Sequence, residues 1–200
     1  MTFDAKRILD ANNIKFWAIG GTILGAQRHK GIIPWDDDVD FGVTVSSIKK
    51  ILSISGQFKK CGYQFVKTWF GYKMVKIGRR NIRGENYSFP NIDFFTFRLY
   101  RGIYKQSEPD ARHTWPKEWY RESQIKNLEI MPFGDFDIYV PKMATKYLDR
   151  MYGKNWNSVA YRQYDHSKEE AIEKKLVKLT AKDRVPAKPT RVIMRKCISH

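Results

Sequence analysis

Residues 17–43 read WAIGGTILGAQRHKGIIPWDDDVDFGV, and this stretch decides the fold. The apolar residues 16–19 at its start predict a buried strand, which ends at Gly20 and Gly21. Thr22 is expected to cap a short helix that follows. A glycine turn between a strand and a helix brings backbone N–H groups close to a phosphate. Gly20, Gly21 and Thr22 are therefore candidate phosphate-binding residues.

Four carboxylates stand within five residues at the end of this stretch, at Asp36, Asp37, Asp38 and Asp40. Like charges this close are costly unless a cation or a basic partner compensates them. If Asp38 and Asp40 open a strand, their side chains point to the same face. Two carboxylates on one face form a hard oxygen site suited to Mg²⁺ or Mn²⁺. The alternative is an acidic loop whose carboxylates only cap helices and turns.

A later acidic residue, Asp93, lies in a predicted strand and is flanked by apolar residues. A carboxylate in such a strand needs a partner. A metal ion shared with Asp38 and Asp40 would supply one, and a hydrogen bond from the backbone or from an arginine is the alternative. A phosphate-binding turn beside a carboxylate metal site is the minimum apparatus for transferring a phosphoryl-containing group.

The rest of the chain predicts an α+β fold, in which a small mixed sheet is flanked by helices. Helices are expected at residues 3–13, 46–60, 143–152 and 168–179, a strand at 92–100, hairpins at 63–77 and 128–140, and irregular structure at 101–126. The expected division places a catalytic domain at residues 1–166 and a basic helical or irregular tail at 167–200.

The composition narrows the class of protein. The 200 residues include 42% hydrophobic residues, which suits a globular chain, and only two cysteines, which excludes a disulfide-rich scaffold and a Cys-rich zinc module. A net charge of +16 favours anionic partners, and the basic tail could associate peripherally with an anionic membrane. The chain starts without an apolar leader and has no spanning segment, so a cytoplasmic location is expected.

The motifs together resemble the LicD/fukutin-related family of the nucleotidyltransferase-fold superfamily. The superfamily pattern is a Gly-Gly or Gly-Ser turn, then Asp-x-Asp on a strand, then a third Asp on a later strand. The long form Gly-Gly-Thr-x-Leu-Gly-x-x-Arg-His-x-Gly-x-Ile-Pro-Trp-Asp-Asp-Asp-x-Asp is typical of LicD-like proteins, and residues 20–40 match it. A weaker likeness continues to about residue 158, and the basic tail has no counterpart.

The resemblance implies a nucleotidyltransferase-like fold and a metal-dependent phosphotransferase. Such an enzyme moves a phospho-alcohol or sugar-phosphate unit, such as phosphocholine or ribitol phosphate, from a CDP-activated donor to a hydroxyl of a glycan or glycolipid such as lipopolysaccharide, and CMP leaves. Asp38 and Asp40 would hold Mg²⁺ or Mn²⁺. Asp93 would complete the metal site or act as base on the acceptor hydroxyl, and Asp36 would support the site at its mouth.

Three further residues of the matching stretch are candidates for substrate binding. Arg28 and His29 could bind the donor phosphates or the acceptor, although basic residues also suit the C-terminal end of a helix. Trp35 could stack on a cytosine or a sugar ring, and the alternative is an aromatic side chain of the core or its rim.

Two other functions fit parts of the sequence. A nucleotidyltransferase that uses CTP or another NTP on a small phosphate or an RNA end would need the same three carboxylates. A non-catalytic module that binds anionic polymers would use the basic surface, but the acidic cluster would repel such a polymer. No RNA-binding signature is evident, so no nucleic acid partner is expected.

Overall fold

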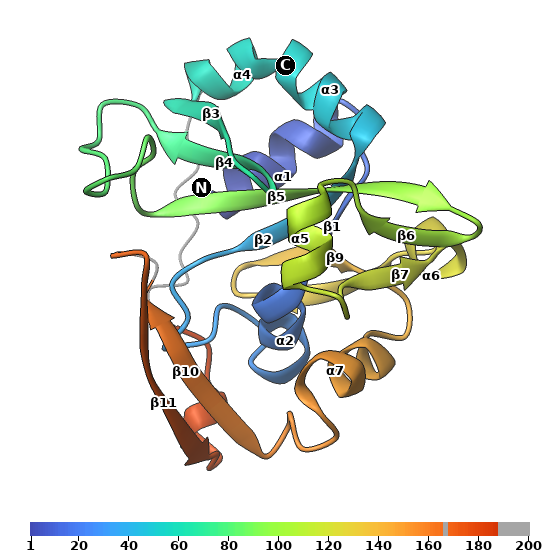
Figure 1. Cartoon of the computed structure of the whole chain (residues 1–200), viewed down its shortest axis with the longest axis vertical. Helices are drawn as coiled ribbons and strands as arrows, with labels where there is room; N and C mark the ends of the chain where they lie inside the picture. The colour runs from blue at the N-terminus through green and yellow to red at the C-terminus, as the bar shows by residue number, and fades with distance from the viewer. Residues whose placement is uncertain (166–167, 188–200) are drawn as a thin grey trace.

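The centre of the computed structural model, which describes residues 1–165 and 168–187, is a seven-stranded mixed sheet (Figure 1). Its strands are β1 (Phe16–Ala18), β2 (Asp40–Thr44), β3 (Tyr63–Lys67), β4 (Gly71–Lys76), β5 (Asn91–Tyr100), β6 (Ile103–Gln106) and β7 (Trp119–Arg121). Five strands follow the order β1-β2-β5-β4-β3, and β6 pairs with β5 and β7. Strands β2 and β5 are parallel, whereas the other pairs are antiparallel.

Helices flank the sheet. Figure 1 shows α3 (Val45–Ser53) and α4 (Ser55–Lys60) at the top of the view with α1 (Thr2–Ala11) beneath them, and α2 (Gly20–Arg28) and α7 (Ala144–Tyr152) in the lower half of the view. Two hairpins complete this lower side, β8 (Glu129–Phe133) with β9 (Phe136–Val140) and β10 (Val159–Asp165) with β11 (Glu170–Lys178). None of the helices in the described part of the chain is long and apolar enough to cross a bilayer.

Three central strands place charged residues on one rung of the sheet. Asp40 of β2 pairs in register with Asp93 of β5, and Asp93 pairs on its other side with Lys73 of β4. Side chains of paired residues lie on the same face of a sheet. The register therefore lines up two carboxylates and an ammonium group side by side.

The core beside this rung is aromatic. Trp17 of β1 is fully buried against Phe97 and Tyr120. Its indole lies over Gly42, the residue with which it pairs, where a Cβ atom would be only 2.4 Å from the indole Nε1. Because Gly42 has no Cβ atom, the Trp17 indole can pack directly on the backbone of β2, and this contact holds the start of β2 in place.

The structure confirms the α+β fold and most of the expected elements, and it corrects three of them. The helix expected at residues 46–60 is two helices that meet at Ile54. The stretch 101–126 is not irregular, because it forms β6, α5 (Pro109–Thr114), β7 and α6 (Glu122–Lys126). The helix expected at residues 168–179 is wrong, because β11 occupies most of that range.

The expected C-terminal tail is described only as far as residue 187. A short 3₁₀ helix, η1 (Lys182–Arg184), follows β11. Residues 166–167 and 188–200 lie outside the described residues, and with them most of the expected irregular tail. The division into a domain at 1–166 and a tail at 167–200 stays a prediction.

Candidate active site

The three carboxylates expected to share a metal lie together. One oxygen each of Asp38, Asp40 and Asp93 lies within 4.8 Å of the other two. Asp40 is the first residue of β2, and Asp93 is its partner on β5. Asp38 comes from the loop just before β2 rather than from the strand itself. Its carboxylate nevertheless lies beside those of Asp40 and Asp93.

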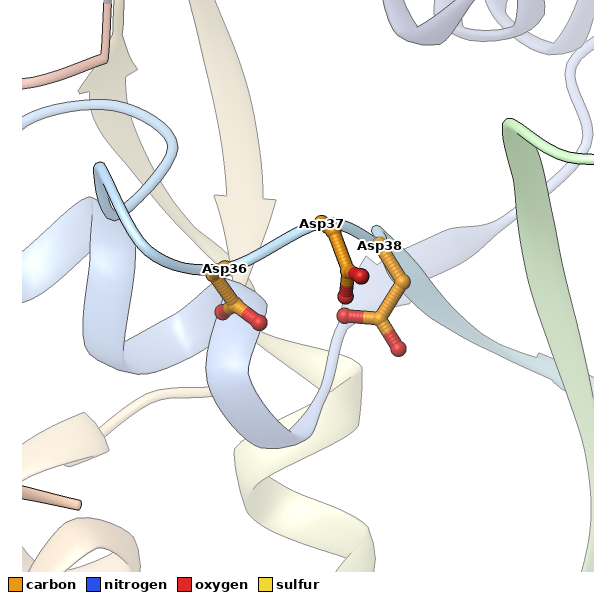
Figure 2. Close-up of side chains that lie close together, drawn as sticks. All are labelled: Asp36, Asp37 and Asp38. Atoms are coloured by element: carbon orange, nitrogen blue, oxygen red, sulfur yellow. The ribbon is translucent and has the colours of Figure 1, made fainter. Parts of the chain in front are cut away.

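The loop before β2 supplies a second acidic group. Asp36, Asp37 and Asp38 also have oxygens within 4.8 Å of one another. Figure 2 shows the three side chains on the same side of this loop, with the carboxylates of Asp37 and Asp38 turned toward each other. Asp38 belongs to both groups, so the acidic residues form one continuous cluster. Asp36 belongs only to the group without Asp40 and Asp93, and its supporting role at the mouth of the site stays a prediction.

Lys73 is the partner of Asp93, and the sequence did not reveal it. Its Nζ lies 2.8 Å from each carboxylate oxygen of Asp93 and 3.3 Å from Oδ1 of Asn91. The ammonium group is buried, and it also lies 4.8 Å from the centre of the Tyr87 ring. A lysine between Tyr72 and Met74 in a predicted strand was the available signal, but only the register shows that it faces Asp93.

Burial and charge act together on Asp40. Burial raises the pKa of its carboxyl group well above the usual value, and the neighbouring charges of Asp38 and Asp93 raise it further. Such a cluster of carboxylates is costly in the absence of a cation. Its oxygen donors, held close together where β2 begins beside β5, fit a hard divalent ion such as Mg²⁺ or Mn²⁺.

The glycine turn lets the chain approach these carboxylates closely. Gly20 has a φ of +53°, and a Cβ atom on it would lie 3.1 Å from Oδ2 of Asp40. A Cβ atom on Gly21 would lie 2.7 Å from Oδ2 of Asp36. The two glycines therefore leave space for the acidic cluster directly above the first turn of α2.

Thr22 and Gly20 have structural partners at this turn. The Oγ1 atom of Thr22 accepts a 2.8 Å hydrogen bond from the backbone N–H of Asp40, so Thr22 fixes the start of β2 instead of capping the helix. The N-cap residue of α2 is Ile19. The backbone N–H of Gly20 donates a 2.8 Å hydrogen bond to the hydroxyl oxygen of Tyr147 on α7. This N–H is therefore engaged with α7, and phosphate binding by this turn stays a prediction.

A buried carboxylate, Glu118, was also missed in the sequence. It accepts hydrogen bonds from the hydroxyl groups of Tyr147, at 2.6 Å, and Tyr120. Burial raises the pKa of Glu118, whereas the two tyrosine bonds lower it. Glu118 lies in the stretch that was expected to be irregular, where no pattern indicated a buried acid. A chain of hydrogen bonds thus runs from the glycine turn through Tyr147 to Glu118.

Arg28 and His29 both bind the chain that follows α7. The guanidinium group of Arg28 donates to the backbone oxygens of Trp156, at 2.5 Å, and Val159, at 3.0 Å. Burial lowers its pKa to about 10, so it is charged at neutral pH. His29 is buried, and its Nε2 lies 2.8 Å from the backbone oxygen of Asp183.

Arg28 and Trp35 line the cleft over the carboxylates, whereas His29 does not. The ring of Trp35 packs edge-on against His29, with ring centres 5.5 Å apart. His29 thus supports the cleft wall from behind, and the structure does not bring it to the acidic cluster. Substrate binding by Arg28 and Trp35 stays a prediction.

The cleft has a volume of about 850 Å³ and joins the acidic cluster to an aromatic end. Its floor holds the glycine turn, the carboxylates and Lys73. Residues after α7 form part of its wall, among them Trp156, Val159 and Ala160. The remaining lining includes Trp69, Phe70, Tyr87, Phe95, Gln106, Trp115, Glu118, Tyr152 and Glu169. A cleft of this size can hold a nucleotide-sized ligand.

Much of the chain matches a known family of proteins. Residues 13–143 match the family model described as LicD/FKTN/FKRP, nucleotidyltransferase domain. The match includes the glycine turn and all the carboxylates of the acidic cluster. An uncharacterised protein of Rickettsia typhi is 32% identical over 164 residues, which are 82% of this chain and 48% of that protein.

Two relatives have names that state an activity. One is less similar in sequence, and the other shares only a short segment. The human ribitol 5-phosphate transferase FKRP is 26% identical over 73% of this chain and 29% of its own length. The lipopolysaccharide cholinephosphotransferase LicD of Haemophilus influenzae is 76% identical over 21 residues, which are 10% of this chain and 8% of that protein. The chain thus spans half or less of these relatives. The family match covers most of the chain and contains the whole acidic cluster, and on this basis the chain belongs to the LicD/FKTN/FKRP nucleotidyltransferase-domain family.

Proposed function

We propose that this chain is a metal-dependent phosphotransferase. It moves a phospho-alcohol or sugar-phosphate unit, such as phosphocholine or ribitol phosphate, from a CDP-activated donor to a hydroxyl of a glycan or glycolipid, and it releases CMP. The observation that carries the proposal is the convergence of Asp38, Asp40 and Asp93 at the floor of a large cleft, in a chain of this family. Relatives named as ribitol-phosphate and choline-phosphate transferases support the class of cargo.

In this proposal Asp38 and Asp40 hold Mg²⁺ or Mn²⁺. When bound, the ion neutralises charge that builds on the departing CMP and offsets the repulsion among the carboxylates. The chain's own residues fix the geometry around it. Thr22 holds the backbone of Asp40 through its hydroxyl group, and Lys73 holds both oxygens of Asp93.

The transfer itself exchanges one phosphorus–oxygen bond for another. The acceptor hydroxyl oxygen attacks the phosphorus of the phospho-alcohol, and the bond from that phosphorus to the CMP oxygen breaks. The hydroxyl proton must pass to a base, because a neutral hydroxyl is a poor nucleophile. Asp93 is the candidate base, and the alternative role for the same carboxylate is to complete the metal site.

Incubation with CDP-choline and CDP-ribitol, each with Mg²⁺, Mn²⁺ or EDTA, tests the proposal, with CMP as the readout. We expect metal-dependent CMP release that Asp40→Asn loses. The matched control is Asp137→Asn, which removes an exposed carboxylate on β9, away from the cleft. Equal release by the wild type and Asp40→Asn would contradict the assignment of the site. Consumption of CTP with release of pyrophosphate would replace the proposal by the nucleotidyltransferase alternative.

A further inference from the structure

One end of the cleft has an aromatic wall that begins beside the third carboxylate. Phe95 follows Asp93 by two residues on β5, so both side chains lie on the same face of the sheet. Phe70 stacks on Phe95, with ring centres 4.4 Å apart, and Trp115 packs edge-on against Phe95. An apolar aromatic surface therefore starts next to the residue proposed to meet the acceptor hydroxyl.

Trp69 extends this surface into solvent. Its ring stacks on Trp115 with centres 5.1 Å apart and an angle of 10° between the planes. Trp69 is 51% exposed and lines the cleft, although most large apolar side chains of this protein are buried. An exposed indole at the mouth of a cleft is typical of a ligand-binding surface, because burial by the ligand recovers the apolar area.

A buried polar group stands at the same end of the cleft. Gln106 lines the cleft and is only 2% exposed, and among the described residues its Oε1 has no hydrogen-bond partner. The backbone oxygen of Gln106 accepts a 2.8 Å hydrogen bond from Arg112, so its main chain is held beside the cleft that the residue lines. A buried amide oxygen without a partner costs stability, and a bound hydroxyl group would satisfy it.

We propose that this end of the cleft is the acceptor subsite and takes a sugar or polyol. The apolar C–H face of the ligand packs on the exposed face of Trp69, which Trp115 supports from the other side, and one of its hydroxyl groups donates to the amide oxygen of Gln106. This inference rests on the proposed function for the identity of the ligand as acceptor. It adds that the acceptor is recognised by ring stacking and one buried amide, on the Asp93 side of the acidic cluster.

The first test measures binding alone and does not depend on transfer. Saturation-transfer NMR of the full chain uses methyl β-galactoside, methyl N-acetyl-β-glucosaminide and ribitol as probes, with cytidine as the competing class of ligand. We expect signal from at least one of the three sugar or polyol probes. Trp69→Ala should weaken it about 10-fold, the scale of a lost aromatic contact. Tyr100→Ala, which removes an exposed ring outside the cleft, should leave it unchanged.

Gln106→Leu separates recognition from folding. The substitution removes an unsatisfied buried polar group, so thermal stability should stay the same or rise, while the sugar signal weakens about 10-fold. A loss of both stability and binding would show a structural role and overturn the assignment of Gln106. Signal from cytidine that Trp69→Ala abolishes, with none from the sugar probes, would overturn the acceptor subsite in favour of a base-binding one.

The second test separates this inference from the proposed function. Steady-state transfer from the preferred CDP donor is measured against the sugar probe that binds. Trp69→Ala and Gln106→Leu should raise the KM for the acceptor about 10-fold, the scale of a lost aromatic contact, and leave the KM for the donor unchanged. A raised donor KM would overturn the subsite. Absence of CMP release by the wild type would count against the proposed function, and the NMR result would still stand on its own.

Discussion

At the scale of single residues, the site depends on two glycines as much as on its carboxylates. The positive φ of Gly20 suits a residue without a Cβ atom, and the space above it holds the Asp40 carboxylate. The carboxylates can lie this close to the first turn of α2 only because the glycines there have no side chain to occupy the same space.

Gly20→Ala should therefore reduce both stability and activity. The strained backbone should cost about 1–2 kcal/mol in the free energy of unfolding, and displacement of Asp40 should slow CMP release. Gly56→Ala is the control, because Gly56 lies in helix α4 with open space around it. There alanine should raise stability by about 1 kcal/mol. Urea unfolding of both variants checks this, and equal effects would contradict the special role of Gly20.

Asp40→Asn should separate stability from activity. The substitution removes one of three crowded carboxylates, of which Asp93 is buried and the other two are half-buried, so the melting temperature in EDTA should rise. CMP release should fall by about 100-fold or more, the scale of losing one preorganised electrostatic group. Calorimetry in EDTA and the CMP assay with Mg²⁺ measure the two effects. A lower melting temperature in EDTA would show that the carboxylates are compensated without a metal.

At the scale of the elements, strand register brings the site together. Strand β5 lies between a strand that carries a carboxylate and a strand that carries an ammonium group, and all three residues share one rung. Lys73 thus neutralises Asp93 from the side opposite to Asp40. Charge balance in the site is therefore a property of three strands rather than of one motif.

Lys73→Met should unfold the protein more easily, because it leaves Asp93 buried without its cation. Breaking a buried pair in this way costs about 3–5 kcal/mol. If the carboxylates bind a divalent ion, Mg²⁺ should restore part of this loss. Urea unfolding with EDTA and with Mg²⁺ measures both, and Lys67→Met, an exposed lysine on β3, is the control. No effect of Mg²⁺ on the variant would argue against metal binding by Asp93.

Tyr147→Phe tests the contact between α7 and the glycine turn. Loss of the hydroxyl group leaves Glu118 and the N–H of Gly20 each without one hydrogen bond. We expect a loss of about 1–3 kcal/mol in stability and slower transfer through movement of the turn. Tyr100→Phe, at an exposed position, should change neither quantity. Urea unfolding and CMP release are measured on the same variant. A fall in stability with unchanged CMP release would contradict the proposed effect on the glycine turn.

The elements also show where prediction from the sequence succeeded and where it failed. Strong periodicity and turn residues predicted the strands around Asp40 and Asp93 and both hairpins before residue 141. Residues 170–178 are rich in Glu and Lys, which favour a helix, but pairing with β10 outweighs this preference. Strands of three and four residues, such as β7 and β6, are too short to produce a period.

The site was predictable where its residues are close in sequence. The glycine turn and the acidic cluster lie within residues 20–40, and their types alone indicated a metal site. Lys73 and Gln106 come from other strands, and their roles depend on register and burial. Neither property can be derived from one sequence without knowing which strands are neighbours.

At the scale of the whole molecule, the end of α2 is fastened to the chain beyond the family match. His29 contacts the backbone of Asp183, and Arg28 holds the segment between α7 and β10. These contacts keep the wall formed by Trp156 and Val159 against the cleft. The described segments around Trp156, Val159 and Asp183 thus pack against the end of the helix that begins at the glycine turn.

His29 should make this unit sensitive to acid. Burial lowers its pKa from the usual 6.5 to about 4. Between these values the unfolded chain binds a proton that the folded protein does not, so stability should fall as the pH drops from 6.5 to 4. His29→Gln should show a smaller loss over this window in urea unfolding. An identical pH dependence in both proteins would contradict a neutral buried His29.

The parallel pairing of β2 and β5 has a consequence for how the protein folds. Parallel neighbours cannot be joined by a tight turn, and here the connection contains α3, α4, β3 and β4. The chain must close this long loop before Asp40 meets Asp93, and such distant contacts form slowly. During refolding, metal binding and catalysis should consequently return only in the last phase, after most of the helical signal. A partly folded chain would hold the whole sequence motif and still have no site.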